Sequence, residues 1–434
     1  MRYNLRHLRV FLAVVDYGSV TRAATDCYVS QPAVTQTIAK LEAETGVALF
    51  TRSPQGLFVT GPGRVLADRV RRAFALLDPV LGDLSPRLTR MATSAQLQAL
   101  IAVREAENFT LAARRMGLAQ PTVHRAVNQL EQEAARPLFE RTSYGMVATR
   151  PAQALAQAAR LAFAELDQAE ADLAEATGRE VGRIVVGAMP LSRSHILPNA
   201  IVQFRKSRPH LPIRVLDGPY ADLLAGLRRG EIDMLVGAIR DPAPIGDVVQ
   251  HVLFHDALVL VAGRDHPIRA EGAITLDDLA RYPWVVSVQG TPSRAHFDRL
   301  FAPLGARAPH SIVESGSLIL MRQLLQTSQH LGCISRLQAE AEIAEGRLAV
   351  LPFDLSHTMR PIGLTLRAGW RPTAAQRLFL THLGMVSDEA AAPRPTGLAA
   401  APRQTEMRRR RSSSSGPRMS APVPDSPTSP RSIT

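Results

Sequence analysis

One short sequence occurs twice in this chain, and the repeat constrains its fold more than any other feature. SQPAVTQTIAKLE occupies residues 30–42, and AQPTVHRAVNQLE occupies residues 119–131. Residues 5–62 align with residues 94–151 without a gap, and 18 of the 58 aligned positions are identical. A gapless match over the length of a small domain indicates a duplicated module.

The pattern within each copy predicts three helices followed by a two-stranded hairpin. In copy one the first helix has an apolar stripe at helical spacing, and the second begins after Ser19 and contains the paired alanines Ala23 and Ala24. Small residues there allow the close approach of helices that a helix-turn-helix needs. The third helix opens with a serine cap at Ser30 and a first-turn proline. LFTRSPQGLFVT, at 49–60, predicts the hairpin, or wing.

The third helix of each copy is expected to present a polar face with few acids, which suits the major groove of DNA. Arg52, on the hairpin, is placed to reach a phosphate or the minor groove. We predict DNA contacts from both copies: Ser30, Gln31, Pro32, Ala33, Thr35, Gln36, Lys40 and Arg52 in copy one, and Gln120, Pro121, Thr122, His124, Arg125 and Arg141 in copy two.

Charge and composition permit this interpretation and exclude others. The net charge of +12 allows nucleic-acid binding without proving it. No run of eighteen apolar residues predicts a membrane helix, and the N-terminus is too charged for a signal peptide, so we expect a cytoplasmic protein. Cys27 and Cys333 are too few for a disulfide framework or a four-ligand zinc site. His251 and His255 lie in a strand-like segment, and we expect no metal.

Beyond the modules, the chain divides into long helices, an α/β region and a polar tail. Ala-, Leu- and Arg-rich helices are predicted at about 63–84 and 152–177, and the wide apolar face of the second favours pairing with another chain. From Gly182 apolar strands alternate with helices, which predicts a largely parallel sheet. The tail from 388 is rich in proline, serine and arginine, and we expect it to be disordered.

SVTRAATDCYVSQPAVTQTIAKLE together with LFTRSPQGLFVTGPG resembles the winged helix-turn-helix of LysR-type transcriptional regulators. Residues 180–385 resemble that family's effector-binding domain, a two-lobed α/β fold similar to periplasmic binding proteins. The second module departs from the family's usual plan. Cys27 stands where the family usually has leucine, and we expect it in the core.

The resemblance implies a sequence-specific transcription regulator of multidomain α and α/β fold, controlled by a small effector. It implies double-stranded DNA and RNA polymerase as partners and a homodimer or homotetramer, with no cofactor and no enzymatic activity. The expected domains are a first winged helix-turn-helix at 1–62, a linker at 63–93, a second winged helix-turn-helix at 94–151, a dimerisation helix at 152–179, an effector domain at 180–387 and a tail at 388–434, with lobe I at about 180–260 and 348–387 and lobe II at about 261–347.

Four loops in the effector domain are candidates for binding an anionic ligand at helix N-termini. Arg193 is the expected counter-ion, and Tyr220 is expected to stack on or hydrogen-bond a ring. The predicted effector contacts are Ser192, Arg193, Ser194, Tyr220, Gln289, Gly290, Thr291, Ser315 and Gly316. Helix capping explains the hydroxyl side chains equally well.

Two functions from other classes stay open. A solute-binding protein that acquired helical segments would explain the α/β domain, but we expect no signal peptide and the duplicated module is expected to read DNA. The second alternative is a DNA-organising protein whose α/β domain no longer binds a ligand. The polar side chains of the four loops, which suit ligand binding, argue against it.

Overall fold

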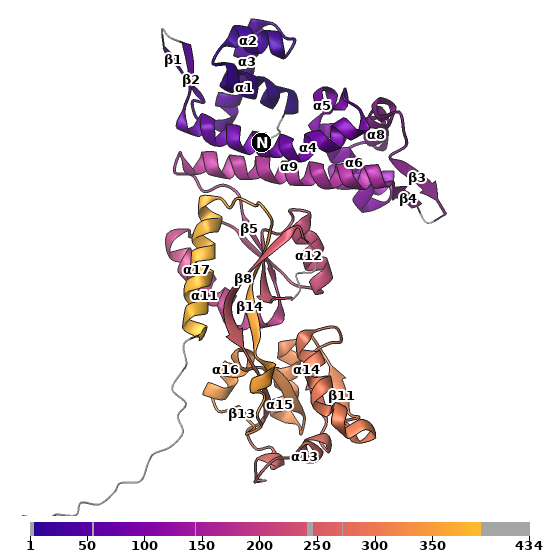
Figure 1. Cartoon of the computed structure of the whole chain (residues 1–434), viewed down its shortest axis with the longest axis vertical. Coiled ribbons are helices and arrows are strands. Elements are labelled where there is room, and N and C mark those ends of the chain that lie inside the picture. The colour runs from indigo at the N-terminus through magenta and orange to yellow at the C-terminus, as the bar shows by residue number, and fades with distance from the viewer. Residues whose placement is uncertain (1–3, 54–55, 144, 241–245, 271, 392–434) are drawn as a thin grey trace, which may run out of the picture. The chain divides into compact units, whose positions relative to one another are not determined.

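The computed structural model describes residues 4–53, 56–143, 145–240, 246–270 and 272–391 (Figure 1). The tail predicted to be disordered lies outside these residues from 392 onward. Helix α17, Ala374–Ala391, continues into the first residues of that predicted tail.

Each copy of the repeat folds as three helices and a hairpin, followed by a long helix. The first copy consists of α1 (Leu5–Tyr17), α2 (Val20–Asp26), α3 (Gln31–Thr45), β1 (Phe50–Ser53), β2 (Gly56–Val59) and α4 (Gly61–Leu84). After the short α5 (Leu88–Met91), the second consists of α6 (Ser94–Ala106), α7 (Phe109–Met116), α8 (Gln120–Ala134), β3 (Phe139–Thr142), β4 (Gly145–Ala148) and α9 (Arg150–Glu175).

Several of the repeated residues hold the hairpin against the third helix. The carboxylate of Glu42 accepts hydrogen bonds from the backbone N–H groups of Leu49, at 2.7 Å, and Phe50, at 3.2 Å. Glu131 accepts the equivalent bonds from Leu138 and Phe139 at 2.7 and 3.1 Å. These bonds satisfy backbone donors that begin each hairpin. The repeated glutamate is therefore a structural residue.

The long helices α4 and α9 lie side by side and join the two copies (Figure 1). One continuous hydrophobic core extends through both modules and both long helices. The apolar face of α9, including Leu155, Leu166 and Leu173, is buried within this chain. We predicted that this face pairs with a second chain. The structure corrects this, because α4 covers it.

The region after α9 contains two five-stranded sheets with helices packed on them. The first sheet has the order β6-β5-β7-β14-β8, and the second has the order β11-β10-β12-β9-β13. The strands of the first sheet are β5 (Ile184–Ala188), β6 (Ile213–Leu216), β7 (Met234–Ala238), β8 (Val248–Asp256) and β14 (Arg360–Arg367). Those of the second are β9 (Leu258–Gly263), β10 (Trp284–Val286), β11 (Ile312–Glu314), β12 (Leu331–Ser335) and β13 (Leu348–Val350).

The helices of this region follow the strands in alternation. They are α10 (Pro190–Ser194), α11 (Ile196–Ser207), α12 (Tyr220–Arg228), α13 (Leu276–Ala280), α14 (Pro292–Phe301), α15 (Leu318–Thr327) and α16 (Arg336–Ala344), with the short 3-10 turns η1 (Pro267–Ala270), η2 (Ala302–Arg307) and η3 (Ser356–Thr358).

Two predictions about these sheets need correction. Each sheet is mixed, since β14 runs antiparallel to β7 and β8, and β9 runs antiparallel to β12 and β13. The predicted lobe II, 261–347, is too short at both ends. Strands β9 and β13 hydrogen-bond to each other within the second sheet, so the chain passes into that sheet just before Leu258 and leaves it after Val350.

Candidate functional site

The third helix of each copy, α3 or α8, is called its recognition helix. In copy one this helix presents the polar face that its sequence predicts. The side chain of Ser30 caps α3 by accepting a hydrogen bond from the backbone N–H of Ala33. Val34, Ile38 and Leu41 are buried on the inner face. Among the predicted contacts, Ala33 is half-buried and the others are exposed: Ser30, Gln31, Pro32, Thr35, Gln36 and Lys40. The first turn carries no acid, so an N-terminal helix dipole faces outward without a competing negative charge.

The recognition helix of copy two has the same exposure with different chemistry. Ala119 replaces the capping serine, so α8 begins without a side-chain cap. Its exposed contacts are Gln120, Pro121, Thr122, His124 and Arg125. His124 lies 3.2 Å from the side-chain nitrogen of Asn128, and its ring centroid is 5.0 Å from that of Phe109. These contacts orient the imidazole on the outer face of the helix.

The two hairpins carry one exposed arginine each. Arg52 lies on β1 opposite Leu57, and Arg141 lies on β3 opposite Met146. Both side chains are exposed. Guanidinium groups on a wing can bind phosphate oxygens, which fixes the register of a protein on DNA. Each module thus joins a polar helix to a hairpin that carries an exposed arginine.

A cavity lies between the two sheets of the α/β region. It is bounded by three of the predicted loops, after β5, after β10 and after β11. Its lining is Met189, Pro190, Leu191, Ala238, Arg240, Ser287, Val288, Thr291, Pro292, Ser293, Ser315, Gly316, Leu318, Met321, Gln338, Arg360 and Ile362. Most of these side chains are apolar, with a few polar groups between them, as is usual for small-molecule sites.

Three of the predicted effector contacts line this cavity, namely Thr291, Ser315 and Gly316. Thr291 also caps α14 by accepting a hydrogen bond from the backbone N–H of Arg294. The hydroxyl of Ser315 accepts one from the backbone N–H of Ser317 at 3.0 Å. Capping and turn formation therefore explain part of why these hydroxyls are present.

The other six predicted contacts are not part of the lining. Ser192 is fully buried and donates to the carbonyl of Met189 at 2.7 Å. Ser194 donates to a carbonyl within its own helix, and Gln289 and Gly290 are exposed. Tyr220 lies at the start of α12, outside the cavity. Arg193 is paired with Asp217 at 2.7 Å, so a surface carboxylate already neutralises the predicted counter-ion.

Arg360, which the sequence did not single out, is the principal cationic group of the cavity. It begins β14 and is buried, and its Nη2 donates to Asp256 at 3.2 Å. Its Nε and Nη1 are also buried and have no hydrogen-bond partner among the described residues. Burial lowers the pKa of Arg360 and raises that of Asp256, while each charge favours the ionised form of the other. Unpaired buried donors are costly, so this guanidinium favours an added acceptor.

A second arginine of the lining, Arg240, contacts a predicted residue. Its guanidinium lies over the ring of Tyr220, 4.6 Å from the centroid, a cation–π arrangement. Burial raises the pKa of Tyr220, so the phenol is neutral. Tyr220 therefore supports an arginine of the cavity wall and does not form that wall itself.

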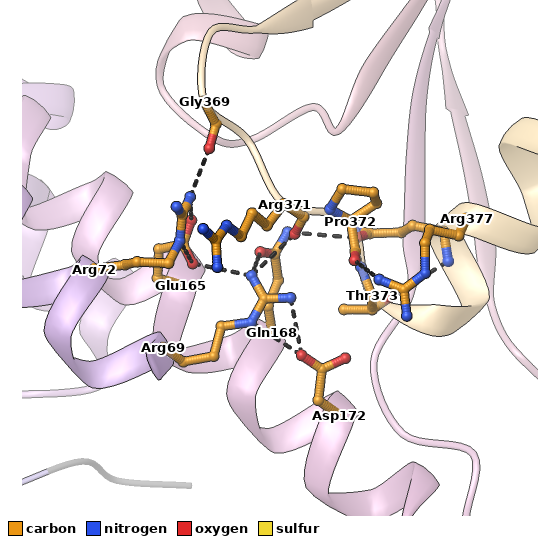
Figure 2. A network of polar contacts seen from close by, with 11 residues as sticks. Arg69, Arg72, Glu165, Gln168, Asp172, Gly369, Arg371, Pro372, Thr373 and Arg377 are labelled. Atoms are coloured by element: carbon orange, nitrogen blue, oxygen red, sulfur yellow. Dashed lines mark hydrogen bonds and ion pairs between the residues drawn. The ribbon is translucent and has the colours of Figure 1, made fainter. Parts of the chain in front are cut away.

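A buried polar cluster connects both long helices to the α/β region (Figure 2). Arg69 of α4 donates to Glu165, Gln168 and Asp172 of α9, at 3.0, 2.7 and 2.9 Å. The same guanidinium donates to the carbonyl of Arg371 at 2.9 Å. The segment that contains Arg371 directly follows β14, the strand that begins with Arg360.

Arg72 extends this cluster on the same face of α4. It binds Glu165 through two hydrogen bonds of 3.0 Å each and donates to the carbonyl of Gly369 at 2.7 Å (Figure 2). A paired guanidinium and carboxylate with two parallel bonds is among the stronger polar contacts in proteins. The two arginines therefore contact the α/β region through its backbone carbonyls, while Glu165 and Asp172 of α9 balance their charge.

The cysteines and the histidine pair take structural positions. Cys333 is fully buried in β12, and burial raises the pKa of its thiol to about 12. Cys27, which we placed in the core, is half-buried at the end of α2. His251 and His255 lie on strand β8, as their context predicts. Among the described residues, no three His, Cys, Asp or Glu side chains gather as metal ligands would.

Comparison with known proteins identifies the family. Residues 5–64 and 94–153 each match the bacterial regulatory helix-turn-helix protein of the lysR family, and residues 177–387 match the LysR substrate binding domain. The HTH-type transcriptional regulator GalR of Pseudomonas putida is 35% identical over 391 residues, 89% of this chain and 98% of that relative. This chain belongs to the LysR family.

The two helix-turn-helix matches confirm that this LysR regulator carries a duplicated helix-turn-helix module. The transcriptional regulator YdcI of Escherichia coli K12 is 31% identical over 272 residues, 62% of this chain and 88% of YdcI. The full-length LysR-type regulator LysG of Corynebacterium glutamicum, solved with bound effector Arg, shares the fold at 18% identity and a TM-score of 0.50, over 68% of this chain and 98% of LysG. Within the described residues, none of the helices has the length and apolar character needed to cross a membrane.

Proposed function

We propose that this LysR regulator reads DNA with both of its modules and is controlled by a small carboxylate bound between its two sheets. The observation that carries the ligand class is Arg360, whose two buried and unpaired nitrogens border the cavity. Asp256 balances the positive charge of Arg360, but the guanidinium keeps two donors without acceptors. A bound carboxylate would accept hydrogen bonds from these donors.

The rest of the cavity wall suits a ligand with an apolar body. Met189, Val288 and Met321 line it, and methionine side chains adapt to irregular shapes. The N-termini of α14 and α15 also border it, and their dipoles favour negative charge. We therefore favour an aromatic or branched carboxylic acid over a sugar.

The strand β14 links the proposed ligand site to the helix-turn-helix modules. Arg360 begins this strand, and the carbonyls of Gly369 and Arg371, just beyond its end, accept hydrogen bonds from Arg72 and Arg69. Ligand binding would close the lobes and shift this strand relative to the long helices. The ligand changes DNA affinity only as far as it favours one arrangement over the other.

The partners belong to the same proposal. A regulator of this kind acts on double-stranded DNA in the cytoplasm and communicates with RNA polymerase. A homodimer or homotetramer would form through surfaces other than the buried face of α9.

A thermal-shift titration with benzoate and with benzamide tests the ligand class, because the two differ in charge and hardly in shape. We expect benzoate or a related aromatic acid to raise the melting temperature and the amides to leave it unchanged. Arg360→Lys keeps a charge beside Asp256 but removes the fork of donors, and it should weaken carboxylate binding roughly tenfold or more, about 1.5–3 kcal/mol.

The matched control is Arg193→Gln, which should leave binding unchanged because Arg193 pairs with Asp217 outside the cavity. Equal stabilisation by acids and amides would refute the carboxylate assignment. Loss of binding in the Arg193 variant alone would restore the site predicted from sequence. Effector control itself requires that the carboxylate also change the affinity for DNA, and that DNA change the carboxylate affinity by the same factor.

A further inference from the structure

The two long helices use the same face to pack within the chain. In the repeat, α4 positions Leu66, Val70 and Leu77 correspond to α9 positions Leu155, Ala159 and Leu166. All six side chains are buried, as are the equivalent alanines Ala73 and Ala162. Equivalent faces of equivalent helices thus face a shared core.

The ends of these helices show that they run in opposite directions. Beyond the end of α9, Arg179 donates to the carbonyl of Thr45, the last residue of α3 in the first module, at 3.3 Å. Near the end of α4, the carbonyl of Asp83 accepts a bond of 3.5 Å from Arg136, just after α8 in the second module. Each long helix therefore begins at its own module and ends against the recognition helix of the other.

These two contacts are counterparts of one another. In both, the end of one module's long helix meets the chain at the C-terminal end of the other module's recognition helix. Two copies of a module that meet through equivalent surfaces in this reciprocal way are related by an approximate two-fold rotation, as in a symmetric dimer. Here both copies belong to one chain.

A two-fold rotation orients the two recognition helices as an inverted pair. A DNA duplex has its own two-fold axes, and paired readers of this kind match two inverted half-sites about one helical turn, 10–10.5 bp, or a multiple of it apart. The exposed faces differ, since Thr35 and Gln36 stand in α3 where α8 has His124 and Arg125. The two half-sites should therefore differ in sequence.

We propose that a single chain is a complete reader of an imperfect inverted repeat in double-stranded DNA, with one half-site for each module. This inference rests on the proposed function, in that both modules must contact DNA. The intrachain pairing of α4 and α9 provides the two-fold relation, and oligomers add further copies of the composite site.

Selection from a random duplex library with the full chain tests this proposal. We expect a motif of two dissimilar inverted halves. Native mass spectrometry should then show complexes with one chain for each pair of half-sites, whatever the oligomeric state. A motif with a single half, a direct repeat, or two chains for each pair of half-sites would overturn the inference while leaving specific DNA binding intact. A failure to enrich any motif would count against the proposed function itself.

Two matched variants assign the halves. One carries Gln31→Ala, Thr35→Ala and Gln36→Ala, and the other carries Gln120→Ala, Thr122→Ala, His124→Ala and Arg125→Ala. Each variant should lose about tenfold or more in affinity for the full motif. Scrambling the half-site read by the altered module should then cause no further loss of affinity, whereas scrambling the other half-site should still weaken binding. Sensitivity of either variant to both halves, as in the wild type, would contradict the one-module, one-half assignment.

Discussion

At the residue scale, Ala135 and Gly46 hold equivalent places at the ends of the two recognition helices. Both have left-handed backbone, with φ of 50° at Ala135 and 73° at Gly46. A residue with a Cβ atom is strained there by about 1–2 kcal/mol. We expect Ala135→Gly to stabilise the end of α8 by about 1 kcal/mol, measured as slower hydrogen exchange of the α8 amides by mass spectrometry.

Gly46→Ala is the reciprocal control for that prediction. A Cβ atom at Gly46 would meet only the guanidinium of Arg179, at an ordinary contact distance of 3.6 Å, so conformation alone sets the cost. The amides of α3 should exchange faster by a similar free energy. Equal exchange in both variants and the wild type would show that neither position is strained.

The residues of the cavity show what a sequence can and cannot reveal at this scale. Thr291 and Ser315 were predictable because loops between strands and helices bear hydroxyls that cap helices and bind ligands. The sequence could not show that Arg193 pairs with Asp217 outside the cavity, because that pairing depends on two segments brought together by the fold. Arg360 was missed since an arginine at the start of a strand has no local pattern that signals burial beside a cavity.

At the scale of elements, the pairing of α4 with α9 depends on a buried ionic cluster. The Arg69 side chain is 7% exposed, and its removal leaves Glu165 and Asp172 with fewer partners. We expect Arg69→Met to destabilise the pairing by about 3 kcal/mol. Urea unfolding measured through Trp370, which lies beside Arg72 and Glu165, would report it in a Trp284→Phe background.

Arg71, on the same helix, is the control for Arg69. Its side chain is 46% exposed and pairs with Asp16 and Asp68 at the surface. Surface ion pairs contribute about 0–1 kcal/mol, so Arg71→Met should shift the urea midpoint little. Similar losses in the two variants would mean that the buried cluster adds nothing beyond helix content.

The same cluster predicts a dependence on pH. Burial by itself raises the pKa of Glu165, but hydrogen bonds from Arg72 and Arg69 outweigh it and hold that pKa below its ordinary value. A lowered carboxyl pKa adds stability that is present above about pH 4.5 and is lost as pH falls through the folded-state pKa. Glu165→Gln should therefore be less stable than the wild type at pH 6, with a difference that shrinks in acid. A difference independent of pH would contradict this.

Helices and hairpins were predicted correctly where the residues next to them carry the signal. The helix caps at Ser19 and Ser30 in copy one, and the hairpin glycines Gly56 and Gly145 in the two copies, are signals carried by neighbouring residues. The lobe crossing was misplaced because β9 and β13 pair across a long stretch of chain. Nothing in either strand's own residues shows which sheet it joins.

At the scale of the whole molecule, the repeat revealed two helix-turn-helix modules, but not their arrangement. The apolar face of α9 predicted a partner helix, and a sequence cannot distinguish a partner in the same chain from one in another chain. The structure gives that face to α4, the equivalent helix of the first copy. The apolar face of α9 is therefore buried within the chain, and both helix-turn-helix modules belong to every chain.

DNA reading by both modules is the proposal on which the composite site depends. Its most direct test is the affinity of the full chain for a duplex that the wild type selects, at several salt concentrations, with the two recognition-helix variants described above. We expect both variants to lose specific affinity while nonspecific, salt-dependent binding remains. If only the Gln31, Thr35 and Gln36 variant loses it, the second module is a structural spacer and the claim is wrong.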